Sequence, residues 1–120
     1  MTIKAYLYNK CSTCTKAKKW LEATNIPFQE IAIVDNPPTA EELRTYWQNS
    51  GIDLKKFFNV SGQFYRELGL KDRLPSMSED EMLDLLASNG KLIKRPLITD
   101  GQTVTLGFKE EDLQKAWGNA

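Results

Sequence analysis

Apolar and polar side chains alternate at the beginning of the chain, where Ile3, Ala5 and Leu7 occupy every second position. A period of two residues is typical of a β-strand that buries one face, so we expect a strand here. A second short apolar run, FQEIAIV at residues 28–34, predicts another strand. The chain therefore begins with two strands, and a longer segment with a different pattern separates them.

That segment has the period of an α-helix. Ala17, Trp20 and Leu21 recur at helical spacing, and charged residues, mostly lysines, occupy the other faces. A strand, a helix and a second strand in this order predict a βαβ unit with parallel strands and a right-handed crossover.

The middle of the chain is predicted to be helical. Thr39 with Glu42, and Ser78 with Glu81, each form a capping-box pattern ahead of an apolar helical face. A capping box satisfies two of the free N–H groups at the start of a helix, so the pattern marks where each helix begins.

Two shorter helices are expected between these capped ones. They fall in LKKFFN (residues 54–59) and GQFYRELGL (residues 62–70), on either side of a turn. Gly51 follows the first capped helix and Gly90 follows the second, and a glycine in that position is an ordinary helix stop.

The end of the chain predicts a hairpin and a helix. The segment RPLITDGQTVTLG contains two short apolar runs around Asp100-Gly101, which is a strong turn signal. A last amphipathic helix is expected over about residues 109–117, with Leu113, Ala116 and Trp117 buried.

This order of elements predicts the fold class. It is α/β, with a thioredoxin/glutaredoxin-like mixed sheet and a helical insert between the N-terminal βαβ unit and the C-terminal ββα unit. We expect one domain over residues 1–120. Its core comprises about residues 1–36 and 91–120, and its insert about residues 37–90.

Composition narrows the class of protein. The 120 residues suit one domain, and 16 basic residues balance 16 acidic ones. Balanced charge gives no sign of direct nucleic-acid binding or of attraction to an anionic membrane. The start of the chain lacks the apolar stretch of a signal peptide, and no run is long enough to cross a bilayer. We therefore expect a cytoplasmic protein.

The two cysteines of the chain, Cys11 and Cys14, lie between the first predicted strand and the helix. Cys11 is expected just before the helix, where free N–H groups and the helix dipole stabilise a thiolate and lower its pKa. Cys14 shares a helical face with Ala17 and Leu21 and should be more buried. This arrangement is typical of an attacking thiol followed by a resolving thiol.

Other interpretations of the pair stay open. A structural disulfide across so short a loop would contribute only about 2 kcal/mol. Two cysteines in a chain without histidine supply half of a tetrahedral zinc shell, so a metal site would need a second subunit. Two unreactive thiols are a third alternative. A Cys-X-X-Cys motif placed between a strand and a helix favours a redox pair, with no metal or cofactor.

Arg95 is the third candidate site residue. It precedes Pro96 at the start of the predicted hairpin, where a proline is compatible with a strand start and with a cis bond. In this fold Arg95 would lie near the sulfur atoms, where it could hold an anion or lower the thiol pKa. An ordinary exposed arginine is the alternative.

Three segments together resemble the arsenate reductase-like (ArsC/Spx) family. They are YNKCSTCTKAKKWLE near the start, FFNVSGQFYRELGL in the middle and LIKRPLITDGQTVTLGFKEEDL near the end. The resemblance covers nearly the whole chain and is strongest to small uncharacterised members from Gram-positive bacteria. It implies a thioredoxin-like fold with a helical insert.

One branch of that family reduces arsenate with glutathione and glutaredoxin, through one cysteine and three arginines. The resemblance implies that Cys11 is the nucleophile and that Arg95 is the arginine before the proline. The other two arginines have no counterpart, since residues 57–59 contain none and Lys109 stands near the third position. Each lost charge-assisted hydrogen bond costs about 1.5–3 kcal/mol, so efficient arsenate reduction is not expected.

The Spx branch has a Cys-X-X-Cys switch and regulates transcription by binding the RNA polymerase α subunit. Gly51 lies near the position of a glycine that contacts polymerase in that branch, although it also fits a helix stop. The resemblance therefore implies two alternatives. One is a thiol–disulfide oxidoreductase that an external thiol regenerates, namely thioredoxin, glutaredoxin or a low-molecular-weight thiol. The other is an Spx-like redox-sensing regulator.

Overall fold

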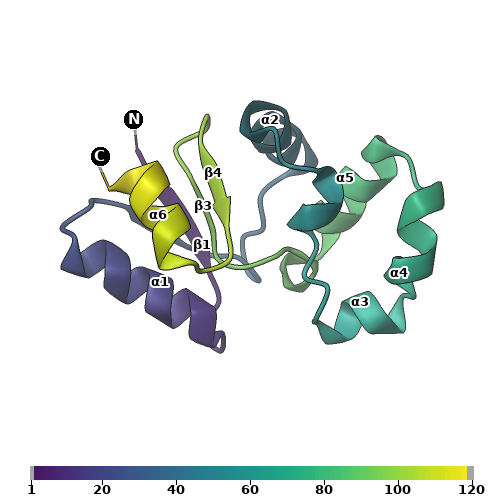
Figure 1. Ribbon diagram of the computed structural model, residues 1–120. Helices are drawn as coiled ribbons and strands as arrows, with labels where there is room; N and C mark the ends of the chain where they lie inside the picture. Colours follow the sequence, from purple (N-terminus) through teal and green to yellow (C-terminus); the bar gives the residue numbers. More distant parts are fainter. Residues whose placement is uncertain (1, 119–120) are drawn as a thin grey trace.

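A four-stranded mixed sheet forms the centre of the computed structural model, which describes residues 2–118 (Figure 1). The strands are β1 (Lys4–Leu7), β2 (Gln29–Ala32), β3 (Leu97–Thr99) and β4 (Val104–Leu106), in the spatial order β2-β1-β3-β4. β1 pairs in parallel with β2, whereas β3 is antiparallel to both β1 and β4. The predicted βαβ unit and hairpin are therefore confirmed.

Two helices cover one face of this sheet, α1 (Ser12–Ala23) and α6 (Glu110–Trp117) (Figure 1). Side chains alternate between the two faces of β1, and Ala5 and Leu7 lie on the face that packs against these helices, together with Ile98 of β3. Further residues buried in this cluster are Ile3, Cys14, Ala17, Leu21, Ile26, Leu113 and Trp117.

The segment between β2 and β3 is helical, as predicted, and covers the other face. Its longer helices are α2 (Ala40–Ser50) and α5 (Glu79–Ser88), and both begin with the expected capping boxes. The shorter elements are η1 (Leu54–Phe57), α3 (Gln63–Glu67), α4 (Leu70–Arg73), η2 (Leu74–Ser76) and η3 (Gly90–Leu92). Among residues 2–118, no helix is both long and apolar enough to span a membrane.

One continuous cluster of apolar side chains joins this helical insert to the sheet. Tyr6, Leu97 and Val104 belong to the sheet and share one cluster with buried residues of the insert, such as Leu43 of α2 and Leu86 of α5. Within the cluster the hydroxyls of Tyr6 and Tyr46 are 3.1 Å apart, so each buried hydroxyl has a partner.

The helices expected at residues 54–59 and 62–70 differ from the prediction. The first is a 3₁₀ helix that ends at Phe57, because Phe58 turns to an extended conformation and pairs with Ile93. The second is broken at Gly69, which adopts the left-handed conformation with φ of 63°. Leu68, before the break, is exposed, whereas Leu70, after it, is buried in the core. The change of direction at Gly69 therefore brings Leu70 into the core.

The two glycines expected as helix stops have different roles. Gly51 ends α2 in the left-handed conformation, as predicted. Gly90 is not the stop of α5, because Asn89 caps that helix and Gly90 begins η3. A β-carbon on Gly90 would lie 2.0 Å from the carbonyl oxygen of Ile33. Gly90 is therefore required for the close approach of two backbone segments, not for the helix end.

We expect Gly90→Ala to lower the free energy of unfolding by about 3 kcal/mol, since the backbone at Ile33 must move to accept the methyl group. Urea titration followed by circular dichroism measures this loss. Gly51→Ala is the matched control, with open space around the glycine and a cost of about 1 kcal/mol from its left-handed backbone alone. Equal losses in the two variants would contradict the close contact at Gly90.

Candidate active site

The chain turns sharply between the end of β1 and the start of α1. The N–H of Cys11 donates a hydrogen bond to the carbonyl oxygen of Tyr8 at 3.1 Å, which closes this turn. Cys11 is the N-cap residue of α1, and its own carbonyl accepts from the N–H of Thr15. Its sulfur therefore lies at the helix N-terminus, where free N–H groups favour negative charge.

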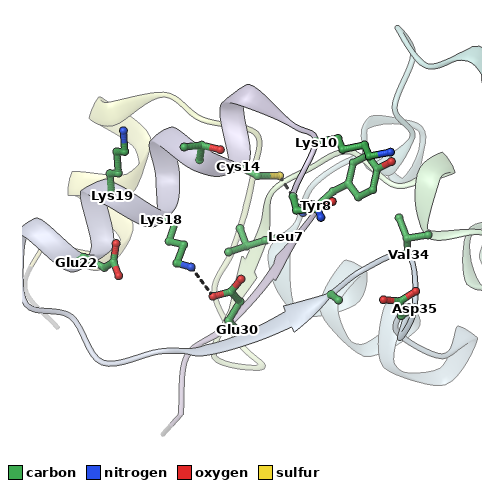
Figure 2. Close-up of a pocket in the computed structure, with 13 residues that line it drawn as sticks. Leu7, Tyr8, Lys10, Cys14, Lys18, Lys19, Glu22, Glu30, Val34 and Asp35 are labelled. Carbon is green, nitrogen blue, oxygen red and sulfur yellow. Dashed lines mark hydrogen bonds and ion pairs between the residues drawn. The ribbon is translucent and has the colours of Figure 1, made fainter.

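Cys14 lies in the first turn of α1 and is 1% exposed. The N–H of Tyr8 donates to its sulfur at 3.4 Å, as the dashed line in Figure 2 marks. Burial and the hydrogen bond with Cys11 disfavour the charged form and raise the pKa of Cys14 to about 12, although the Tyr8 N–H acts in the opposite direction. Cys14 is therefore a neutral thiol near pH 7.

Cys11 is only half-buried, and the balance of effects on its sulfur is reversed. Burial opposes ionisation, but hydrogen bonds from Thr13 and Cys14 and the positive charge of Arg95 outweigh it and lower the pKa of Cys11. The hydroxyl of Thr13 lies 3.0 Å from the Cys11 sulfur. The two cysteines are free thiols, and their pKa values are shifted in opposite directions.

Thr13 connects the Cys11 sulfur to Arg95. Its hydroxyl can donate to the carbonyl oxygen of Arg95 at 3.5 Å, or to the Cys11 sulfur. A hydroxyl has one proton to donate, so it cannot serve both acceptors at once. When Cys11 is a thiol, Cys11 can donate to Thr13 while Thr13 donates to the carbonyl. When Cys11 is a thiolate, the Thr13 proton is available to the sulfur.

Arg95 lies beside this turn, at the start of β3. The Arg95–Pro96 bond is cis, and the guanidinium carbon is 4.9 Å from the centre of the Tyr8 ring. The Nε and Nη1 atoms are buried and have no hydrogen-bond partner among the described residues 2–118. The structure therefore brings together Cys11, Cys14 and Arg95, the three residues singled out in the sequence.

Lys91 is a neighbour that the sequence reasoning missed. Its Nζ lies 5.9 Å from the ring centre of Tyr8 and 5.8 Å from that of Phe64. Lys91 belongs to η3 and Phe64 to α3, so the helical insert contributes two side chains to the surroundings of Tyr8. Nothing in the sequence near Lys91 distinguishes it from an exposed lysine, and only the packing of the insert places it here.

A hollow lies between α1 and the edge strand β2 (Figure 2). It has a volume of about 660 Å³, and Lys18 and Glu30 form a 2.9 Å ion pair within it. Cys14 lines this groove, whereas Cys11 and Arg95 do not. We place the candidate site at Cys11, because the half-exposed, acidic thiol and the unpaired guanidinium lie there.

Comparison with known proteins identifies the family. The ArsC family model matches residues 6–116, which include both cysteines, the whole insert and Arg95. The chain belongs to the ArsC family. It is 57% identical to the uncharacterised protein YusI of Bacillus subtilis, over 98% of this chain and 99% of YusI. It is 28% identical to the global transcriptional regulator Spx 1 of Lactococcus lactis, over 93% of this chain and 86% of that one.

Solved structures of ArsC-type proteins have the same fold. An ArsC family related protein from Bacteroides fragilis has a TM-score of 0.92 and 49% identity, over 97% of this chain and 98% of the other. A protein from Streptococcus mutans, described as a possible arsenate reductase, has a TM-score of 0.87 and 47% identity over 94% and 98%. The expected resemblance and fold class are therefore confirmed, and the family includes both regulators and arsenate reductase-like proteins.

The lowered pKa of Cys11 predicts that iodoacetamide labels it with a midpoint below pH 8.5, the ordinary thiol value, while Cys14 is labelled only in alkaline solution. Mass spectrometry of the labelled peptide measures both rates. Thr13→Val removes one hydrogen bond to the thiolate and should slow labelling of Cys11 at pH 7 by about fivefold, for a bond of about 1 kcal/mol.

Thr15→Val is the matched control, because the Thr15 hydroxyl donates to the Cys11 carbonyl and has no contact with the sulfur. It should leave the midpoint for Cys11 unchanged, and Thr13→Ser should restore it. An identical pH profile for Thr13→Val and the wild type would show that the Thr13 hydroxyl does not stabilise the thiolate.

Proposed function

We propose that the protein is a cytoplasmic thiol–disulfide oxidoreductase in which Cys11 is the nucleophile and Cys14 the resolving thiol. The observation that carries this proposal is that one turn holds a half-exposed thiol of lowered pKa and, three residues further along the chain, a buried thiol of raised pKa. Only a thiolate attacks a disulfide, so the lowered pKa of Cys11 makes this residue the nucleophile. The raised pKa of Cys14 keeps that residue protonated during the first step.

In the first step the Cys11 thiolate attacks one sulfur of a disulfide substrate. A bond forms between Cys11 and that sulfur, and the other half of the substrate leaves as a thiolate. In the second step Cys14 loses its proton and attacks the Cys11 sulfur, releasing the second half. The substrate gains two electrons and becomes two thiols, and the two cysteines lose two electrons and become an intramolecular disulfide.

The first step also prepares the second. Two of the effects that raise the pKa of Cys14 are the hydrogen bond with Cys11 and the negative charge of Cys11. Both disappear when Cys11 is joined to the substrate, whereas the N–H of Tyr8 still stabilises a thiolate at Cys14. Joining Cys11 to the substrate therefore removes two of the effects that raise the pKa of Cys14, while burial, the largest of them, remains.

The oxidised pair then needs a reductant from outside the chain. Thioredoxin, glutaredoxin or a low-molecular-weight thiol can supply the two electrons by the same exchange in reverse. Arg95 supports the cycle by stabilising the Cys11 thiolate, and its charge, which forms no ion pair within residues 2–118, attracts an anionic group of the substrate.

Substitution of each cysteine tests the proposed roles. Cys11→Ser should abolish turnover of a small disulfide with a thioredoxin or glutathione system. Cys14→Ser should react once and then accumulate a mixed disulfide, visible as a mass increase of one substrate half. The proposal fails if wild-type protein shows no turnover, and the resolving role fails if Cys14→Ser accumulates no adduct.

A second candidate function is supported by the likeness to Spx 1. In this alternative the same disulfide alters a surface that the RNA polymerase α subunit recognises, with Gly51 on that surface. A binding assay with the C-terminal domain of the α subunit, in the reduced and the oxidised states, tests it. Affinity that depends on redox state, without disulfide turnover, would favour the regulator, and turnover without affinity would exclude it.

A further inference from the structure

Two cations, Lys91 and Arg95, lie against the ring of Tyr8. The Arg95 guanidinium is 4.9 Å from the ring centre, and the Lys91 ammonium is 5.9 Å from it. The same ammonium is 5.8 Å from the ring of Phe64. The ring attracts each cation, whereas the two like charges repel one another, and an anion near both would reduce that repulsion.

Neither cation has an acidic partner. Within residues 2–118 the ion pairs are Lys18–Glu30 and Arg44–Asp80, and both lie elsewhere on the surface. Two nitrogens of Arg95 are buried without any partner, so the charge of this half-buried guanidinium is not neutralised by the described residues. Tyr8, Phe64, Lys91 and Arg95 form a cluster of two rings and two cations. Within the described residues the two positive charges of this cluster have no negative partner.

The cluster is adjacent to the nucleophile. The carbonyl of Tyr8 accepts from the N–H of Cys11, so the Tyr8 ring and the Cys11 sulfur belong to one tight turn. Arg95 is close enough to lower the pKa of Cys11. The hydroxyl of Thr13 also lies 3.0 Å from the Cys11 sulfur and 3.5 Å from the carbonyl oxygen of Arg95. An anion attracted by Arg95 therefore approaches the turn that carries Cys11, and the two rings offer an apolar wall to the atoms attached to that anion.

We infer that this cluster recognises small organic disulfides that carry a carboxylate close to the sulfur, with Lys91 selecting for the negative charge. The inference rests on the proposed oxidoreductase function and specifies its substrate class. The carboxylate lies between Lys91 and Arg95, and the carbon chain or ring of the substrate packs on Tyr8 and Phe64. The Cys11 thiolate attacks the sulfur of that half, and the other half leaves as a thiolate.

A comparison of two disulfides tests this selection. One is 5,5′-dithiobis(2-nitrobenzoate), which carries a carboxylate on each half, and the other is the neutral 2,2′-dithiodipyridine. Stopped-flow absorbance gives the rate constant of each with reduced protein, divided by the rate constant with free N-acetylcysteine to remove intrinsic reactivity. Wild-type protein should prefer the anionic disulfide, and the preference should decline as salt is added.

Lys91→Gln should lower the rate with the anionic disulfide by about fivefold, the effect of one partly exposed charge, and leave the rate with the neutral one unchanged. Lys91→Arg, which keeps the charge, should restore the preference. Lys94→Gln is the matched control, since Lys94 is an exposed lysine three residues away and makes no contact with Tyr8. It should behave as the wild type.

The outcomes separate the two proposals. If the neutral disulfide reacts rapidly and Lys91→Gln leaves the preference unchanged, the selection by Lys91 is refuted while the role of Cys11 stands. If neither disulfide reacts faster than with free N-acetylcysteine, both proposals fail. Calorimetric titration of Cys11→Ser with 3-nitrobenzoate, which cannot exchange sulfur, gives a second measure. Binding that Lys91→Gln does not weaken would also overturn the inference.

Discussion

The backbone of Tyr8 determines the geometry of both cysteines. Its carbonyl accepts from the N–H of Cys11, and its own N–H donates to the sulfur of Cys14. Because Tyr8 directly follows β1, the central sheet fixes the positions of these two groups. The separation of the thiols and their opposite pKa shifts therefore depend on a strand end, not on a flexible loop.

Burial then divides the roles of two identical side chains. Cys14 is one helical turn from Ala17 and packs with it under the sheet, whereas Cys11 stands before the helix and is half-exposed. The same chemical group becomes a poor acid in one place and a better acid in the other. The ArsC family contains both regulators and arsenate reductase-like proteins, and this local chemistry suits a redox pair in either. Members that share the two cysteines must therefore be distinguished by the residues around the pair.

The sequence was sufficient for features that depend on local chemistry. The capping boxes at Thr39 and Ser78, the alternation in β1 and the placement of Cys11 before a helix all follow from neighbouring residues. Features that depend on contacts between distant segments could not be predicted. Gly90 resembled a helix stop, and its contact with Ile33 appears only when the insert is folded. Lys91 became a candidate for the same reason, since its partners Tyr8 and Phe64 are remote in sequence.

The contact between Gly90 and Ile33 has a further consequence. The chain leaves the sheet region at Ile33 and returns at Gly90, and these two points touch backbone to backbone. The two ends of the insert are therefore in contact with each other, so changes in the length of the insert need not alter the spacing of the strands. The insert, including Phe64 beside Lys91, can therefore change during evolution while the two cysteines stay in place. One sheet and one thiol pair can in this way be combined with different inserts.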